Sequence, residues 1–472
     1  MSGFDNRRML DTIRRLNRRN SKITLYKYIN KIHPSQMVYV YRHLHPVERT
    51  NIFQYIIRMD GVGEFIKELD EILIKELFAS LENNQISTIL HKMHSEDIAE
   101  LIENLPNDQS VKIQELLNKK ELDEVEVFLQ YDDESAGRIM SHEFMAFGSD
   151  LTVKKARDRF KEYGEDVEMP FYIYVIDKET NQMVGITSLR QLLLSSEKRL
   201  LKDIMERDFI FVKPDDDREK VANEMAEYNY LALPVLDSQN RLVGIVTVDD
   251  IIDVIREEAT EDILKMAGAG DDEDILLKPV IENAKTRFPW LMASWIGGIF
   301  ALLIISFFEK IMLDQIVLAS FIPIIIGMGG NVGTQTSTII VRGIATGHVN
   351  IDEFYKVIIK EIKVGLILGI IYGILLGLLG AIISLLTESN FLNLSINASP
   401  FDLGLTVSLS IFSSMLIACT VASIIPMILY KVKLDPAVST GPFVTTAIDI
   451  LGVLAYFSIA TILLWCIWQF YI

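Results

Sequence analysis

The distribution of apolar residues divides this chain into two halves. Up to about position 274 apolar and charged residues alternate at short intervals, whereas from about position 288 long apolar stretches are separated by short polar loops. Five of these stretches are close to the roughly 20 residues that cross a bilayer as a helix. The pattern predicts a soluble half followed by a membrane half, with spans at 288–308, 316–341, 364–386, 405–430 and 444–468.

Positive charges fall in every second loop of the membrane half. Lysines and arginines precede the first span and lie between the second and third and between the fourth and fifth, whereas the other loops hold only Lys310. Loops rich in Lys and Arg stay on the cytoplasmic side. Residues 1–31 are basic and lack the apolar core of a signal peptide. We therefore expect a multi-pass protein of the plasma (inner) membrane with its N-terminus in the cytoplasm and its C-terminus outside.

Glycines interrupt two of the predicted spans. The second span contains Pro323 and then Gly327-Met328-Gly329-Gly330-Asn331-Val332-Gly333-Thr334-Gln335, a run that invites a break in the helix. Irregular backbone at membrane depth survives only where protein buries it or where it lines a water-filled cavity, but small residues also serve tight helix packing. We expect a broken, pore-lining second helix, with a tight crossing as the alternative. The third span repeats glycine every four residues, which favours packing, at Gly365, Gly369, Gly373 and Gly377.

Asp449 is an acid within the last apolar stretch, and no positive charge follows it. A carboxylate at membrane depth is costly unless it faces water, a partner or an ion, although a hydrogen bond to Thr445 or Thr446 is an alternative. A single carboxylate with backbone carbonyls and the Asn331 amide oxygen suits a hard cation that keeps most of its water, as Mg²⁺ does. A symmetric dimer that places two such acids on one axis would strengthen the site. The sequence therefore predicts a cation pathway.

Two segments of the soluble half share one pattern. Each has a β-branched strand that ends in Asp and a second strand that contains Gly-Ile, at 171–177 and 183–189 and again at 233–237 and 242–248. This tandem resembles a pair of CBS domains. In that family a Ser or Thr followed three residues later by Asp often holds the ribose and phosphates of an adenine nucleotide. Thr247 and Asp250 fit this pattern, which makes ATP a candidate ligand, whereas Ser188 is followed by Gln191.

An acidic stretch follows the second CBS-like segment. Many of its acids recur at three- and four-residue spacings and so share one helical face: Asp249, Asp250, Asp253, Glu257, Glu258, Glu261 and Asp262. Divalent ions between two such faces would relieve the repulsion of the acids. A solvated acidic helix is the alternative.

Upstream, residues 32–131 read as short amphipathic helices of a superhelical domain. New helical patterns open at His33-Pro34, His45-Pro46, His94-Ser95 and Pro106-Asn107. The basic residues 1–31 are expected to be a tail that contacts anionic lipid or remains solvated. No nucleophile–base constellation or phosphate-cradling loop is visible, so an enzyme is not expected.

The order of these parts resembles the MgtE family of magnesium channels. The resemblance rests on the 131–140 junction Tyr-Asp-Asp-Glu-Ser-Ala-Gly-Arg-Ile-Met, on the 329–335 motif, and on Asp435-Pro436-Ala437 followed by Asp449. It implies a superhelical α-helical N domain, α/β tandem CBS domains and an all-α membrane domain of five helices. The expected boundaries are a basic tail at 1–31, an N domain at 32–131, CBS domains at 132–202 and 203–262, an acidic connecting (plug) helix at 263–287 and a membrane domain at 288–472.

The resemblance also implies roles for particular residues. Asp449 would bind hydrated Mg²⁺ on the pore axis of a homodimer near Asn331, with Asp435 and Glu361 at the cytoplasmic mouth. Regulatory Mg²⁺ would bind Asp250, Asp253, Glu258, Glu261 and Asp262. Two departures are Gly441, which stands where some members have Asn, and Arg256, which adds a positive charge to the acidic face.

The function expected from this resemblance is Mg²⁺ import and magnesium homeostasis, through a Mg²⁺-selective channel that closes when cytosolic Mg²⁺ binds the acidic faces. The alternatives are a membrane-anchored CBS sensor that does not transport, and a cation-coupled Mg²⁺ exchanger. The expected partners are a second copy of the chain, the lipid bilayer and divalent cations, and not nucleic acid.

Overall fold

The computed structural model describes residues 3–163, 167, 169–271, 273–314, 316–349, 353–389 and 399–471. It divides into two compact units, Met1–Glu257 and Glu258–Ile472. The first unit holds three hydrophobic clusters and the second holds one. The predicted division into a soluble half and a membrane half therefore corresponds to separate cores.

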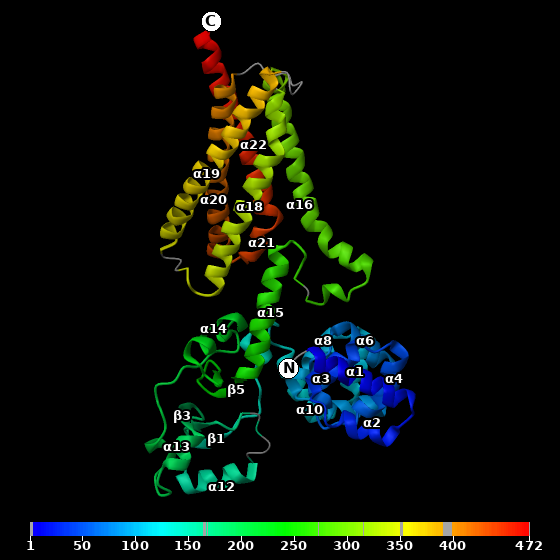
Figure 1. Cartoon of the computed structure of the whole chain (residues 1–472). Helices are drawn as coiled ribbons and strands as arrows, with labels where there is room; N and C mark the ends of the chain where they lie inside the picture. Colours follow the sequence, from blue (N-terminus) through cyan, green and yellow to red (C-terminus); the bar gives the residue numbers. More distant parts are fainter. Residues whose placement is uncertain are drawn as a thin grey trace. The chain divides into compact units, whose positions relative to one another are not determined.

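The first part of the chain is a stack of short helices (Figure 1). They are α1 (Gly3–Arg18), α2 (Lys22–Ile29), α3 (Pro34–Arg42), α4 (Pro46–Ile56), α5 (Val62–Lys67), α6 (Glu71–Ser80), α7 (Asn83–Leu90), α8 (Ser95–Asn104), α9 (Asn107–Leu116) and α10 (Lys119–Phe128). All four helix starts that the sequence predicts are confirmed. Proline is the first helical residue of α3 and α4, a position where its missing N–H costs nothing and its fixed φ is already helical.

The basic N-terminal segment is part of this helical domain rather than a separate tail. Its helices α1 and α2 bury Leu10, Ile13, Leu25 and Ile29, each at most 7% exposed, in the cluster that also holds the core of α3 to α10. Basic side chains are interspersed with these apolar residues, so the amphipathic pattern is less evident in the sequence.

The predicted CBS-like repeat is confirmed in its strands. The first copy is a sheet of β1 (Ala146–Gly148), β2 (Tyr172–Ile176) and β3 (Met183–Ser188), in which β1 and β2 are parallel and β2 and β3 antiparallel. The second copy is the antiparallel pair β4 (Ala232–Leu236) and β5 (Leu242–Thr247). The accompanying helices are α11 (Ala136–Ile139), α12 (Val153–Tyr163), α13 (Leu189–Leu194), α14 (Arg218–Tyr228) and the 3₁₀ turn η1 (Leu201–Asp203).

The acidic helix does not begin at 263. It is α15 (Val248–Met266), which starts directly after β5 and carries the acidic stretch without interruption. Gly268 (φ +65°) and Gly270 (φ +107°) end it, because left-handed backbone is accessible to glycine at little cost. Residues 263–287 therefore contain the end of α15, the 3₁₀ turn η2 (Glu273–Leu276) and the start of the first span.

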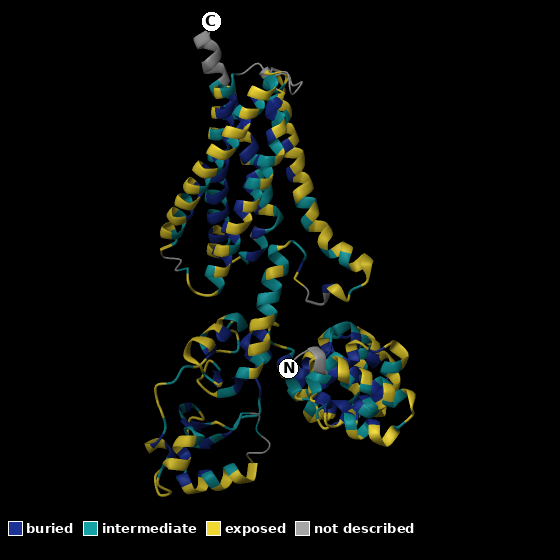
Figure 2. Cartoon of the chain, in the orientation of Figure 1, coloured by how far each residue is buried: buried dark blue, intermediate teal, exposed yellow. Residues whose placement is uncertain are grey.

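In the part of the chain that the structure describes, five helices are long and apolar enough to cross a membrane, as the sequence predicts. They are α16 (Val280–Phe307), α18 (Val317–Ala345), α19 (Phe354–Glu388), α20 (Pro400–Lys431) and α22 (Pro442–Tyr471), with short α17 (Glu309–Asp314) and α21 (Ala437–Thr440) between them. Half of the apolar window of α20 is buried, against 11% for α16. Figure 2 shows the buried positions gathered on the inner faces of the bundle, while α16 and α19 expose long apolar faces.

The glycine ridge of α19 packs against α20, as its spacing predicts. An added Cβ at Gly377 would lie 2.8 Å from the carbonyl oxygen of Gly404, and one at Gly373 would lie 2.9 Å from that of Ser408. These are backbone atoms of the neighbouring helix, so the contact cannot relax by a change of rotamer.

Replacing Gly377 with alanine is therefore expected to destabilise the membrane domain by about 1–3 kcal/mol, because it overpacks a backbone-to-backbone contact. Thermal unfolding of the reconstituted protein measures this change. Gly298→Ala is the matched control, since nothing lies within 4 Å of a Cβ added at Gly298. Equal unfolding temperatures for the two variants would contradict the packing role.

The second span is not broken at its glycine-rich motif. Helix α18 runs continuously from Val317 to Ala345, through Pro323 and the whole of 327–335. A Cβ at Gly333 would lie 2.0 Å from Ile448 Cδ1 of α22, and one at Gly329 would lie 3.2 Å from Ile448 Cγ2. The prediction of a broken helix is wrong, because these glycines receive a side chain of α22 and the helix keeps its backbone hydrogen bonds.

Candidate cation pathway and acidic helix

Asp449 is a half-buried residue of α22. The preceding residue, Ile448, is seated in the gap left by Gly329 and Gly333, and this contact fixes the rotation of α22 against α18. Asp449 lies about 100° further round the helix. A Cβ at Gly330 would lie 4.0 Å from its Oδ1 atom. Gly330 and Asp449, 119 residues apart in the sequence, thus lie close together in the bundle.

The face of α18 beside this place is polar and exposed. Asn331, Thr334 and Gln335 are exposed, whereas Val332, Gly333 and Thr336 are buried against the rest of the bundle. Amide and hydroxyl groups at membrane depth need water, protein or an ion as a partner. The polar groups on this face are therefore poorly suited to contact with lipid tails.

Glu361 lies inside the bundle. This residue of α19 is 5% exposed, and its Oε2 atom accepts a hydrogen bond from Thr336 Oγ1 at 3.2 Å. Thr336 is also 3.8 Å from the sulfur of Cys419 on α20. Glu361 joins three helices of one chain, and the structure does not bring it to the Asp449 face.

Asp435 is held by two contacts at the start of α21. Its Oδ1 atom accepts the backbone N–H of Ala437 at 2.7 Å, and its Oδ2 atom lies 2.7 Å from Lys265 Nζ. Lys265 also pairs with Glu261. Burial alone would lower the pKa of Lys265, but the hydrogen bonds that its ammonium donates to Asp435 and Glu261 raise it above its ordinary value. Two of the predicted acids are therefore brought together by a lysine that the sequence interpretation missed.

Asp262 belongs to the same end of α15. Burial raises the pKa of its carboxyl, the nearby Asp435 raises it further, and Lys265 and Arg342 oppose these effects. The Asp262 carboxyl on α15 therefore interacts electrostatically with Arg342 near the C-terminal end of α18 and with Asp435 just before α21. Lys265 follows Glu261 by four residues, and this spacing was the available sequence signal for the Lys265–Glu261 pair.

Asp250 and Asp253 lie in the first unit, at the start of α15. Asp250 Oδ2 accepts a hydrogen bond from the buried Thr247 Oγ1 at 2.6 Å, and Asp250 Oδ1 lies 2.9 Å from Lys67 Nζ of α5. Burial raises the pKa of Asp253, and Lys67 opposes this rise. Thr247 and Asp250, the candidate nucleotide-binding residues, are therefore hydrogen-bonded to each other. One carboxylate oxygen of Asp250 already pairs with Lys67 of the N domain.

The N domain and the CBS segment share a second junction contact. His94 Nδ1 lies 3.0 Å from Glu143 Oε1, and this hydrogen bond raises the pKa of His94 to about 9. A folded-state pKa above the ordinary value of 6.5 means that His94 stabilises the fold fully below pH 6.5. The contribution is lost as the pH rises through 9.

We expect a loss of under about 1 kcal/mol between pH 6.5 and pH 9, because both side chains are almost half exposed. Chemical denaturation of the wild type and of His94→Gln across this range measures it. The variant is expected to lack this pH dependence, and Glu143→Gln to lack it as well. A wild-type slope retained in His94→Gln would assign the dependence to another group.

No group of three or more His, Cys, Asp or Glu side chains that could hold a metal ion is present in the part of the chain that the structure describes. The predicted regulatory acids are spread along a helix of 19 residues. Mg²⁺ keeps several waters and is often held by only one or two carboxylates. Among the described residues, the acids of this helix therefore do not form a closed metal cage within one chain.

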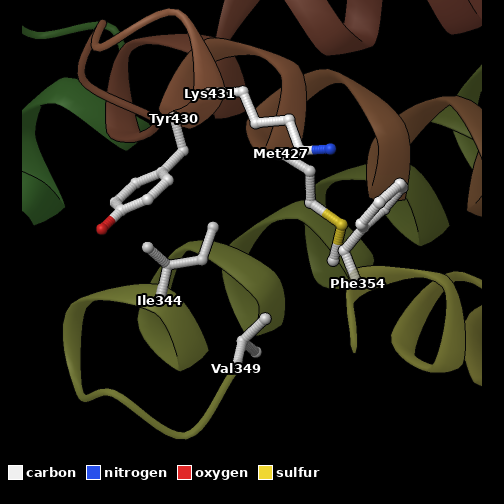
Figure 3. A pocket seen from close by; sticks show the side chains of 6 residues that line it. All are labelled: Ile344, Val349, Phe354, Met427, Tyr430 and Lys431. Carbon is white, nitrogen blue, oxygen red and sulfur yellow. The ribbon is translucent and has the colours of Figure 1, made fainter. Parts of the chain in front are cut away.

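A small hollow lies where the C-terminal ends of α18 and α20 meet the N-terminal end of α19 (Figure 3). Its lining is largely apolar, and Lys431 Nζ is 3.9 Å from the centroid of the Phe354 ring. Its other lining residues are Ile344, Val349, Met427 and Tyr430. With no carboxylate among these residues, it is unsuited to a divalent cation, and its cation–π contact instead holds the end of α19 on α20.

Comparison with known proteins finds three family models along the chain. Residues 322–459 match the family model MgtE, a divalent cation transporter; residues 32–134 match the MgtE intracellular N domain; and residues 201–257 match a CBS domain. The magnesium transporter MgtE of Bacillus subtilis is 32% identical over 94% of this chain and 95% of its own length. That of Thermus thermophilus is 33% identical over 75% of each chain.

The soluble half also resembles a solved structure. The crystal structure of the soluble part of a magnesium transporter matches with a TM-score of 0.50 and 30% identity, over 54% of this chain and 99% of that chain. Fold and site together define a multi-pass membrane transporter with a helical domain and a CBS pair in its soluble half. The chain belongs to the MgtE family of divalent cation transporters and not to a family of enzymes.

Proposed function

We propose that this protein is a Mg²⁺-selective channel that imports magnesium through a pathway at Asp449. The observation that carries the proposal is the position of this intramembrane carboxylate, beside Gly330 and next to the exposed polar face of α18. One carboxylate with amide and carbonyl oxygens binds a cation that keeps its hydration shell. Relatives that are named magnesium transporters, at 32–35% identity, support Mg²⁺ as the substrate.

The pathway is completed by a second copy of the chain. Asn331, Thr334 and Gln335 are exposed in one protomer, and in a bilayer they would otherwise face lipid. A two-fold axis beside α18 and α22 would cover this face with its own copy and bring two Asp449 carboxylates to one ion. The loop charges favour an orientation with the N-terminus in the cytoplasm and the C-terminus outside.

The proposed gate is the acidic helix α15. Cytosolic Mg²⁺ would lower the repulsion among Asp253, Glu258 and Asp262, with Asp250 and Glu261 as further members of the set, and so favour the closed state. Moving an equilibrium from 1:99 to 99:1 requires a differential affinity worth roughly 5.5 kcal/mol, which several weak sites together can supply. Asp435, paired with Lys265 beside α21, links this helix to the inner end of the bundle.

Thr247 and Asp250 are the proposed contacts for an adenine nucleotide such as ATP. The hydrogen bond between them already orders the pair at the N-terminal end of α15, where phosphate is favoured electrostatically. Calorimetric titration of ATP into the full-length protein tests this assignment, and Thr247→Val is expected to weaken binding.

The proposal is tested by Mg²⁺ flux into proteoliposomes that contain the full-length protein, with the cytosolic face held at low or high Mg²⁺. Flux that falls as cytosolic Mg²⁺ rises supports the gate. A current that reverses at the Mg²⁺ equilibrium potential identifies a channel, whereas a reversal that moves with Na⁺ or H⁺ identifies an exchanger. Absence of flux from well-folded protein would contradict transport.

A further inference from the structure

Lys67 joins two domains of the soluble half through one ammonium group. It is the last residue of α5 in the N domain, and its Nζ atom lies 3.4 Å from Asp97 Oδ1 of α8 and 2.9 Å from Asp250 Oδ1 of α15. Asp97 belongs to the N domain, whereas Asp250 opens the helix that follows the second CBS segment. The ammonium therefore stands between two carboxylates that would otherwise face each other across the junction.

This three-residue contact is largely withdrawn from water. The side chains of Asp97, Asp250 and Lys67 are 9%, 15% and 33% exposed. Burial would lower the pKa of Lys67, but the carboxylates of Asp97 and Asp250 raise it above its ordinary value, so the side chain is an ammonium throughout the physiological range. Removing one partner of such a contact leaves a poorly solvated charge, which costs far more than losing a surface ion pair.

The N domain and the second CBS segment also contribute apolar residues to one core around this contact. One hydrophobic cluster includes Val125 and Phe128 of the N domain together with Val212 and Leu233 of the second CBS segment. Other acids of the junction also have cations that the chain itself supplies. Arg138 pairs with Glu103, His94 with Glu143, and Arg218 with Glu134.

We propose that Lys67 is a built-in counter-ion that holds the N domain on the second CBS domain without a divalent cation. Its ammonium takes the position that a divalent ion would need in order to bridge Asp97 and Asp250. This junction then stays closed at low Mg²⁺, and the Mg²⁺ response depends on the acids further along α15. The inference deepens the proposed regulation and rests on that proposal for its connection to transport.

The charges at the contact give the proposal a distinctive consequence. The two carboxylates and the ammonium in contact leave a single negative charge, and Glu100 also interacts electrostatically with Lys67. A divalent ion cannot bridge Asp97 and Asp250 while the ammonium lies between them. Replacing Lys67 with glutamine leaves two close carboxylates with no cation between them. The variant should therefore open at this junction when divalent ions are removed, and Mg²⁺ should close it again by occupying the vacated position.

Hydrogen–deuterium exchange of the full-length protein in nanodiscs, with EDTA or with millimolar Mg²⁺, tests this consequence. In the wild type, α8 and the first turns of α15 are expected to keep their protection within about twofold in EDTA. Lys67→Gln is expected to lose at least tenfold protection there in EDTA and to regain it in Mg²⁺. Lys67→Arg keeps the charge and is expected to behave as the wild type.

The matched control is Lys120→Gln. Lys120 is an exposed lysine of the same domain that pairs with Glu124 of its own helix, so it should resemble the wild type in both conditions. Two results would overturn the proposal: a wild-type junction that opens in EDTA as far as that of Lys67→Gln, or a Lys67→Gln junction that stays protected in EDTA. Protection lost throughout the N domain and not restored by Mg²⁺ would assign Lys67 to folding alone and overturn it as well.

The exchange measurement does not involve transport. If the flux experiment contradicted Mg²⁺ transport, the exchange result at the junction would still hold. If the junction of Lys67→Gln were unchanged, the flux result would still hold. The two failures are therefore distinguishable.

Discussion

Replacing Asp449 with asparagine is expected to reduce Mg²⁺ flux at least 100-fold while the protein folds and assembles normally. The change removes the charge and keeps the size of the side chain. A unit charge about 4 Å from a cation contributes on the order of several kcal/mol at an effective dielectric constant near 20, and each 1.4 kcal/mol is a factor of ten. Flux into proteoliposomes, measured at low Mg²⁺ on the cytosolic face, gives the comparison with the wild type.

A matched control for this variant is Glu309→Gln, which neutralises an exposed acid of the short helix α17 outside the five spans. The flux of this variant should lie within about twofold of the wild type, since salt screens an exposed charge outside the spans. Size-exclusion profiles and unfolding temperatures show whether either variant is misfolded. Wild-type flux from well-folded Asp449→Asn would remove Asp449 from the pathway and make it a structural hydrogen-bonding residue.

The second large effect is expected at the gate. The triple variant Asp253→Asn/Glu258→Gln/Asp262→Asn should lower the ratio of flux at low to flux at high cytosolic Mg²⁺ by roughly tenfold or more. Each acid that is lost removes part of the differential affinity through which Mg²⁺ shifts the open–closed equilibrium. A titration of flux against cytosolic Mg²⁺ measures the ratio.

A triple neutralisation away from α15 serves as the control. Asp108, Glu115 and Glu126 are exposed acids of α9 and α10, and their replacement by asparagine or glutamine changes the net charge by the same amount. This control should keep the wild-type Mg²⁺ dependence. If both triple variants lose it equally, the effect comes from the overall charge of the protein, and α15 is not the sensor.

Local patterns in the sequence were sufficient for much of this structure. Four predicted helix starts of the N domain and the four predicted strands of the CBS-like repeat are observed, because helix-start residues, such as the prolines that open α3 and α4, and β-branched runs act over a few residues. All five spans are observed because twenty apolar residues in a row have few soluble alternatives. Asp449 could be selected for the same reason, as an acid in a segment where acids are costly.

The boundaries of the connecting helix and the conformation of the glycine motif could not be predicted from the local sequence. The resemblance implied a connecting helix at 263–287, but α15 continues from β5 because no breaker interrupts it before Gly268. The run at 327–335 could equally break a helix or receive a neighbour. Ile448 fills the space at Gly329 and Gly333, and a filled gap favours the continuous helix.

The sequence by itself thus determined the kinds of element, their order, the number of spans and the one acid that stands out in an apolar segment. Only the tertiary structure decided which charges meet. Lys67 reaches Asp250 across 183 residues and Lys265 reaches Asp435 across 170, and no local pattern marks either pair. The physical reason is that burial and periodicity are recorded residue by residue along a helix or strand, whereas the partner of a charge depends on which distant segments pack against it.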